Sequence, residues 1–241
     1  MSLQDTVTKQ YVSDPKVFAD AFNYLIYNGE QVIRPEQLTD LDATQFAIPF
    51  REEEEGKPEA TQKYRDVLKT LAVKTDERCT YLVLGIENQT NVHYAMPVRN
   101  MLYDAMQYEK QVRQLAAAHR KKHDAATSDE YLSGMNREDK ITPVITLVIN
   151  FGSKSWDGSL SLYEMMPEQP AKVKAFVQDY KVFLIDPMAM TDADLEHLNS
   201  SLREVLSSIR SRCNGCCKRI IVFRNWNGTQ RWSFKQRPRP N

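Results

Sequence analysis

The sequence predicts an α/β protein in which strands and helices are interspersed along one layered structure. Three apolar runs of strand length support this prediction, and segments with helical spacing of apolar residues lie before, between and after them. Such an arrangement is typical of a β-sheet that is covered by helices. The three runs cover residues 81–86, 143–151 and 180–185.

Local signals predict where the principal helices begin and end. The first helix follows Asp14 and stops at Asn28, because Asn-Gly commonly ends a helix. A long helix begins near Pro97, a residue favoured in the first helical turn, and runs to about His123. A final helix is predicted over 193–209.

The long helix carries an apolar stripe, which predicts the face that it buries. Glu109 falls within this stripe and is expected to pair with Arg113, four residues later on the same side. The stripe consists of Val98, Met101, Leu102, Ala105, Met106, Val112, Leu115 and Ala116.

The composition is that of an ordinary globular protein, with 41% hydrophobic and 27% charged residues. Basic and acidic residues number 32 each, so DNA binding would require a local basic patch. No apolar stretch approaches the ~18 residues of a membrane span, and the N-terminus does not have the order of a signal peptide. We therefore expect a cytoplasmic protein without a membrane partner.

The composition changes abruptly near Arg210. From there onward the chain has nine Lys/Arg, no Asp or Glu, three cysteines and two tryptophans. We therefore divide the chain into a folded domain over 1–212 and a basic tail over 213–241. The tail is either a nucleic-acid arm in which Trp226 and Trp232 stack on bases, or non-native sequence that follows a change of frame or an insertion. The loss of all acidic residues favours the second interpretation.

A predicted hairpin in the segment 64–89 is the most informative feature. If residues 75–78 form its loop, Lys74 lies opposite Cys79 and Asp66 lies opposite Glu87. Opposite residues share one face of a sheet, with their Cβ atoms about 5 Å apart. Gln89, two residues beyond Glu87, lies on the same face.

Two neighbouring carboxylates on an apolar hairpin are costly to desolvate, and a divalent cation would compensate them. Oxygen ligands suit Mg²⁺, with Mn²⁺ as a substitute. Such an ion lowers the pKa of a bound water and neutralises charge on a phosphoryl oxygen, while the Gln89 amide could orient that water or donate to the phosphate. The alternative is that Asp66 pairs with Arg65 or Lys63 and that Glu87 only ends a strand.

At these residues the chain resembles the recombination-promoting nuclease family, often labelled putative transposases, of the PD-(D/E)XK nuclease superfamily. The ordered motifs at 65–68, 85–89 and 94–99 carry the resemblance, with further likeness at 18–23 and 102–105. It extends from about residue 17 to about residue 209, so the domain over 1–212 is expected to be nuclease-like.

The resemblance implies a restriction-endonuclease-like mixed sheet flanked by helices. It also implies magnesium-dependent endonuclease activity on DNA, linked to recombination or a mobile element. By it, Asp66, Glu87 and Gln89 are catalytic, and the metal ligands are Asp66, Glu87, the Asn88 carbonyl and Asp20. Gln89 stands where the superfamily usually has lysine. DNA is the expected partner, no small-molecule cofactor is expected, and a homodimer is left open.

Two basic features are further candidates for DNA contacts. Arg99, at the start of the long helix, either holds a phosphate beside the metal or is an ordinary arginine on a helix face. Arg120, Lys121 and Lys122 either follow the DNA backbone or form a solvated helix end.

A second function from another class is also compatible with the sequence. In it, the chain is a catalytically inactive nuclease-fold module that binds nucleic acid or protein. The glutamine at position 89 and the net charge of zero are the reasons to consider it.

Overall fold

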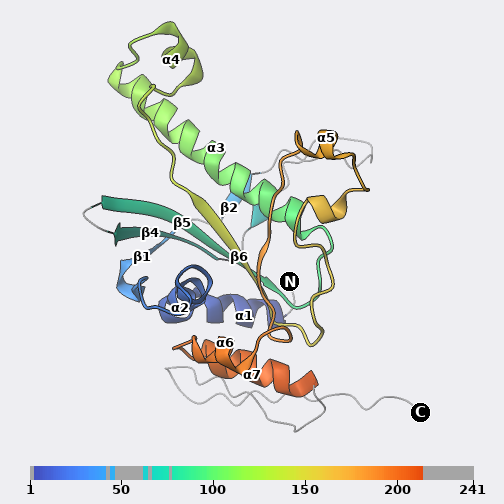
Figure 1. Ribbon diagram of the computed structural model, residues 1–241. Helices are drawn as coiled ribbons and strands as arrows, with labels where there is room; N and C mark the ends of the chain where they lie inside the picture. Colours follow the sequence, from blue (N-terminus) through green and yellow to red (C-terminus); the bar gives the residue numbers. More distant parts are fainter. Residues whose placement is uncertain (1–2, 42–43, 47–61, 65–66, 76–77, 214–241) are drawn as a thin grey trace.

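A mixed five-stranded β-sheet lies at the centre of the structure, in the order β1-β4-β5-β6-β7 (Figure 1). The strands β1, β4 and β5 pair antiparallel, whereas β5, β6 and β7 run parallel. The computed structural model describes residues 3–41, 44–46, 62–64, 67–75 and 78–213. The five strands are β1 (Leu38–Asp40), β4 (Val67–Thr75), β5 (Arg78–Gln89), β6 (Val144–Asn150) and β7 (Phe183–Ile185).

Helices cover both faces of this sheet, which confirms the predicted mixed α/β architecture (Figure 1). A separate two-stranded sheet joins β2 (Thr44–Phe46) to β3 (Gln62–Tyr64). One face is covered by α1 (Leu3–Ser13), α2 (Pro15–Tyr27), α6 (Asp192–Glu196) and α7 (Leu202–Cys213). The other side carries α3 (Met96–Lys122), α4 (Ser128–Ser133), α5 (Ala171–Lys174) and the short 3-10 helix η2 (Tyr163–Met165), while η1 (Pro35–Gln37) follows α2.

Strand alternation makes the two faces of the sheet chemically different. Leu84 and Ile86 of β5, with Leu147 and Ile149 of β6, are fully buried against the helices α1, α2 and α7. Their neighbours in sequence point the other way, toward α3, because successive side chains of a strand alternate. That second face therefore receives Glu87 and other polar side chains.

The hairpin register predicted from the sequence is confirmed over the described pairs. Lys74 lies opposite Cys79, and the pairing continues to Val67 opposite Ile86. Pairing reaches one step further toward the turn than predicted, because residues 75 and 78 also pair and leave two residues between the strands. Asp66 lies outside the described residues.

The predicted final helix over 193–209 is wrong in its continuity, because the structure has two helices there. α6 ends at Glu196 and α7 begins at Leu202. The intervening main-chain N–H groups of Asn199 and Ser200 donate to the carboxylate of Asp20 in α2. A continuous helix would direct these N–H groups to its own carbonyls, so the contact with α2 separates the two helices.

The long helix was located correctly, but its predicted buried stripe is wrong. α3 has Pro97 in its first turn and ends at His123 in the left-handed conformation, and Glu109 pairs with Arg113 as expected. However, Val98 and Met101 of the predicted stripe are 41% and 37% exposed. The helix instead buries Met96, Pro97, Asn100, Tyr103, Asp104 and Gln107.

His119 links the far end of α3 to the chain that follows it. Its Nδ1 lies 2.7 Å from the Asp124 carboxylate and its Nε2 lies 2.8 Å from the Asp139 carboxylate. Both ring nitrogens donate only in the protonated ring. The hydrogen bond to Asp124 is the largest cause that raises the pKa of His119 above its usual value. Burial opposes it, and the hydrogen bond to Asp139 and the charges of both carboxylates raise the pKa further.

We expect the interactions of His119 with Asp124 and Asp139 to weaken as the pH rises. A raised folded-state pKa contributes stability that is complete below the ordinary histidine pKa of about 6.5 and is lost as the pH passes the folded-state value. The amides of α4 should therefore exchange faster at pH 9 than at pH 5, after correction for intrinsic exchange rates. In His119→Gln this pH dependence should disappear; an unchanged profile would contradict the assignment.

Residues 214–241 lie outside the described residues, so the division of the chain at 213 stays a prediction. Within the described ranges, no helix has the length and apolar character needed to cross a bilayer.

Candidate functional site

Glu87 is a fully buried carboxylate in the middle strand of the sheet. It has no exposed surface, and its strand, β5, lies between β4 and β6. Its Oε2 lies 3.2 Å from Nη2 of Arg99, near the start of α3. A buried carboxylate remains charged only with a nearby cation or with hydrogen-bond donors, and Arg99 supplies such a cation.

Arg99 connects this buried carboxylate with the surface. Its side chain is 31% exposed, whereas that of Glu87 is 0% exposed. The guanidinium donates through Nε to the Tyr103 hydroxyl at 3.3 Å and lies 5.5 Å from the centroid of the Tyr103 ring. These contacts hold the arginine in place while part of it still reaches solvent, where a guanidinium can bind an anion.

Gln89 shares the face of β5 from which Glu87 projects. It is the last residue of the strand and is 9% exposed. Its carbonyl accepts a hydrogen bond from the Phe151 N–H at 2.7 Å, which ties the end of β5 to the chain that follows β6. The structure thus brings Glu87, Gln89 and Arg99 to one side of the sheet. Asn88 lies between the first two in β5, and the predicted role of its carbonyl stays a prediction.

The structure does not bring Asp20 to this side. Asp20 belongs to α2, which packs on the face of the sheet that buries Ile86. Its carboxylate accepts the N–H groups of Asn199 at 2.9 Å and Ser200 at 2.8 Å, and the Ser200 hydroxyl at 2.6 Å. These hydrogen bonds compensate the buried carboxylate of Asp20 without a metal. Its predicted role as a metal ligand stays a prediction.

Of the remaining predicted residues, the three basic residues at the end of α3 are not part of this arrangement. Asp66 lies outside the described residues. Arg120, Lys121 and Lys122 are exposed in the last turn of α3. At 1.5 Å per residue they lie about 30 Å along the helix from Arg99. In the described ranges, no three His, Cys, Asp or Glu side chains gather in a way that could hold a metal.

The buried face of α3 carries polar side chains that the sequence analysis missed. Asp104 is 6% exposed and accepts hydrogen bonds from the Thr146 and Tyr180 hydroxyls, each at 2.5 Å. Asn100 has no exposed surface, and neither its amide nitrogen nor its amide oxygen has a hydrogen-bond partner among the described residues. The spacing of 100, 104 and 107 is helical and could have revealed this face, but the apolar stripe beside it was the stronger signal.

His93 lies in the connection between β5 and α3, where its carbonyl accepts the Met96 N–H at 3.0 Å. Burial lowers the pKa of His93, and the positive charge of Arg99 lowers it further. The imidazole is therefore neutral near pH 7, so it can accept a proton or a hydrogen bond. Sequence reasoning missed this residue because a single histidine in a loop carries no spacing signal.

A buried aspartate organises the chain at the carboxyl ends of β6 and β7. Asp186 accepts hydrogen bonds from the Asn150 amide at 3.1 Å, the Ser155 hydroxyl at 3.0 Å and the Trp156 N–H at 2.8 Å. Gln89 ends the adjacent strand β5. Open α/β sheets commonly bind ligands at the carboxyl ends of their parallel strands, so this edge is a reasonable place for a substrate.

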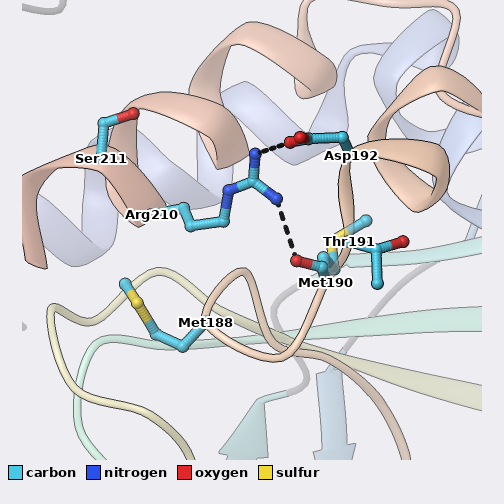
Figure 2. Close-up of a pocket in the computed structure, with 6 residues that line it drawn as sticks. All are labelled: Met188, Met190, Thr191, Asp192, Arg210 and Ser211. Carbon is cyan, nitrogen blue, oxygen red and sulfur yellow. Dashed lines mark hydrogen bonds and ion pairs between the residues drawn. The ribbon is translucent and has the colours of Figure 1, made fainter. Parts of the chain in front are cut away.

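A separate cavity of about 600 Å³ lies beside α7 (Figure 2). Arg210 crosses it, donating to the Met190 carbonyl at 2.9 Å and to the Asp192 carboxylate. The charge of Arg210 is therefore already compensated, and no predicted site residue lines the cavity. Its lining residues are Met188, Met190, Thr191, Asp192, Arg210 and Ser211.

Comparison with known proteins identifies one family. A family model described as "Putative transposase, YhgA-like" matches residues 58–220, a range that contains the hairpin, α3 and the parallel strands. Neither the curated proteins nor the solved structures include a match to this chain.

Proposed function

The chain belongs to the YhgA-like putative transposase family, and from this membership, which links it to mobile elements, we propose that it is a metal-dependent DNA endonuclease of the PD-(D/E)XK type. The observation that carries the proposal is Glu87, a fully buried carboxylate beside Gln89 and within 3.2 Å of the partly exposed Arg99. A mixed sheet with helices on both faces supports it.

The oxygen donors around Glu87 are of the kind that Mg²⁺ prefers. Mg²⁺ binds one or two carboxylates, keeps several waters and takes its remaining ligands from a substrate phosphate. Glu87, the Asn88 carbonyl and Asp66 would hold it, with Mn²⁺ as a substitute. The buried amide of Asn100, without a partner among the described residues, makes the adjoining interior suitable for polar ligands.

A bound metal would lower the pKa of the attacking water and neutralise charge on the phosphate. Two side chains of the protein bind and orient the reactants. Arg99 binds a phosphate oxygen through the part of its guanidinium that reaches solvent, and the Gln89 amide orients the water or donates to the phosphate. DNA is the substrate in this proposal, in keeping with the family.

Supercoiled plasmid incubated with the full chain tests the proposal. Nicked or linear product should form with Mg²⁺ or Mn²⁺ and be absent with EDTA. A chain that binds the plasmid but never cuts it would exclude the endonuclease.

A catalytically inactive binding module is the second candidate. The ion pair with Arg99 favours it, because a carboxylate that is already compensated does not require a metal. Plasmid binding without cleavage is the result that this candidate predicts.

In Gln89→Ala we expect cleavage to slow by about 10- to 100-fold but to remain measurable, because the amide positions a reactant rather than binding the metal. Gln89→Lys, which restores the residue usual in the superfamily, is the matched control and should remain active. Single-turnover cleavage rates measure both. A loss in Gln89→Ala as large as that in a Glu87 variant would instead identify Gln89 as a metal ligand.

A further inference from the structure

Phe176 is the most exposed of the large hydrophobic side chains in the described residues. It is 87% exposed and is the second residue after α5. Contiguous exposed apolar surface often marks an interaction site. Val173, one turn earlier, is 48% exposed, so this short segment is not part of the core.

The backbone that carries Phe176 is nevertheless well anchored. The Tyr163 hydroxyl of η2 donates to the Val177 carbonyl at 2.6 Å, and the Lys174 carbonyl lies 3.1 Å from the same hydroxyl. The Tyr163 N–H donates to Asp179 at 3.1 Å, and the Lys174 ammonium lies 4.6 Å from the Tyr163 ring centroid. An exposed aromatic ring on an ordered support loses little conformational entropy when it binds a partner.

Charge distinguishes this segment from the other exposed aromatic on a short helix. Lys172 and Lys174 precede Phe176, and both are exposed. Tyr131 of α4 is 68% exposed but follows Asp129 and Glu130. An aromatic ring beside cations is suited to a nucleic acid, whose phosphates bind lysines and whose bases stack on aromatic rings. The two acidic side chains that precede Tyr131 disfavour phosphate binding there.

This segment also lies on the side of the sheet that contains Glu87 (Figure 1). After Phe176 the chain returns to α3, where the Tyr180 hydroxyl donates to the Asp104 carboxylate at 2.5 Å. Asp104 follows Arg99 by five residues, which corresponds to about 7.5 Å of helix. The chain that carries Phe176 therefore joins α3 near Arg99, on the side of the sheet to which DNA would bind in the proposed function.

We propose that Lys172, Lys174 and Phe176 form a contact for DNA with unpaired bases, in which the lysines bind phosphates and the Phe176 ring stacks on a base. This inference rests on the proposed function, because DNA is its ligand. Unpaired bases are favoured because their faces are accessible. In a continuous duplex the ring would have to separate stacked bases first, which carries an energetic penalty.

Binding of the full chain to oligonucleotides tests the contact directly. The probes are a single strand containing 2-aminopurine, a duplex with an unpaired bulge, and the matching continuous duplex, all in Ca²⁺ to limit cleavage. Phe176→Ala should weaken binding to the first two by about tenfold, with little change for the continuous duplex. It should also reduce the quenching of 2-aminopurine fluorescence.

Substitutions separate stacking from general apolar contact. Phe176→Tyr should bind like the wild type, whereas Phe176→Leu, which keeps apolar surface but no ring, should resemble Phe176→Ala. Tyr131→Ala is the matched control and should not change binding. Lys172→Gln should reduce the slope of log affinity against log salt by about 0.7 for the single strand. All variants should keep their thermal midpoints, because these side chains are exposed.

The outcomes of this test are distinct from those of the cleavage test. If the plasmid is never cut but Phe176→Ala still weakens binding, the endonuclease proposal fails and the contact stands. If the wild type cuts DNA and Phe176→Ala binds each probe as tightly as the wild type does, the proposed contact is wrong. Concentration-dependent self-association that Phe176→Ala abolishes, with unchanged DNA binding, would overturn it in favour of a protein interface.

Discussion

In Glu87→Gln, metal-dependent cleavage of plasmid DNA is expected to fall by about a thousandfold or more. A bound metal contributes several kcal/mol of charge stabilisation in the transition state, and each 1.36 kcal/mol corresponds to a factor of ten in rate. Glutamine has nearly the same shape but no charge, so it binds Mg²⁺ far more weakly. The fold should be retained, because the guanidinium of Arg99 is partly exposed and can remain solvated after it loses its partner. Asp66→Ala is expected to show the same loss.

Glu109→Gln is the matched control, since this carboxylate is 52% exposed in its pair with Arg113. It should cut like the wild type. Cleavage rates across a Mg²⁺ titration, with circular dichroism to check folding, provide the measurement. Wild-type activity in Glu87→Gln would rule out the catalytic assignment and favour the binding module.

Asp20→Ala is expected to destabilise the protein strongly. Asp20 is 2% exposed and accepts hydrogen bonds from two main-chain N–H groups and the Ser200 hydroxyl. Hydrogen bonds to charged groups are worth about 1.5–3 kcal/mol, and donors left buried without a partner add to the loss. We expect a total of about 3–5 kcal/mol, which corresponds to a decrease of roughly 10 °C in thermal midpoint for a chain of this size.

Asp14→Ala provides the comparison, because Asp14 caps the same helix at an exposed position with one bond, to the Lys16 N–H at 2.8 Å. It should lower stability by only about 1 kcal/mol. Calorimetry of both variants, with Mn²⁺ titrations, separates the two roles of Asp20. A normal thermal midpoint together with weaker Mn²⁺ binding in Asp20→Ala would support a metal ligand and contradict the structural role.

Features that depend on neighbouring residues were accessible from the sequence. The hairpin register, with Lys74 opposite Cys79, follows from the alternation of side chains and a short turn. The position of α3 follows from Pro97 near its start and from the end of its pattern near His123. The pair of Glu109 and Arg113 requires only the helical repeat. The family-like motifs around Glu87 and Gln89 also lie within a short stretch of chain.

Features that depend on distant residues were not accessible in this way. Asp20 finds its partners about 180 residues later, and these contacts, rather than helix propensity, separate α6 from α7. Asp104 is buried because Thr146 and Tyr180, 42 and 76 residues away, bring hydroxyls to it.

The sequence by itself therefore determined the position of α3, the hairpin register and the putative transposase family of this protein. The tertiary structure decided where the last two helices divide and which side of each element is buried. For α3 the apolar stripe was a misleading guide, because the face of the sheet beneath it presents Glu87, Gln89 and Thr146. A helix that covers polar groups must offer them polar partners, since an unpaired polar atom inside a protein is costly. α3 accordingly buries Asn100 and Asp104 and leaves Val98 and Met101 partly exposed.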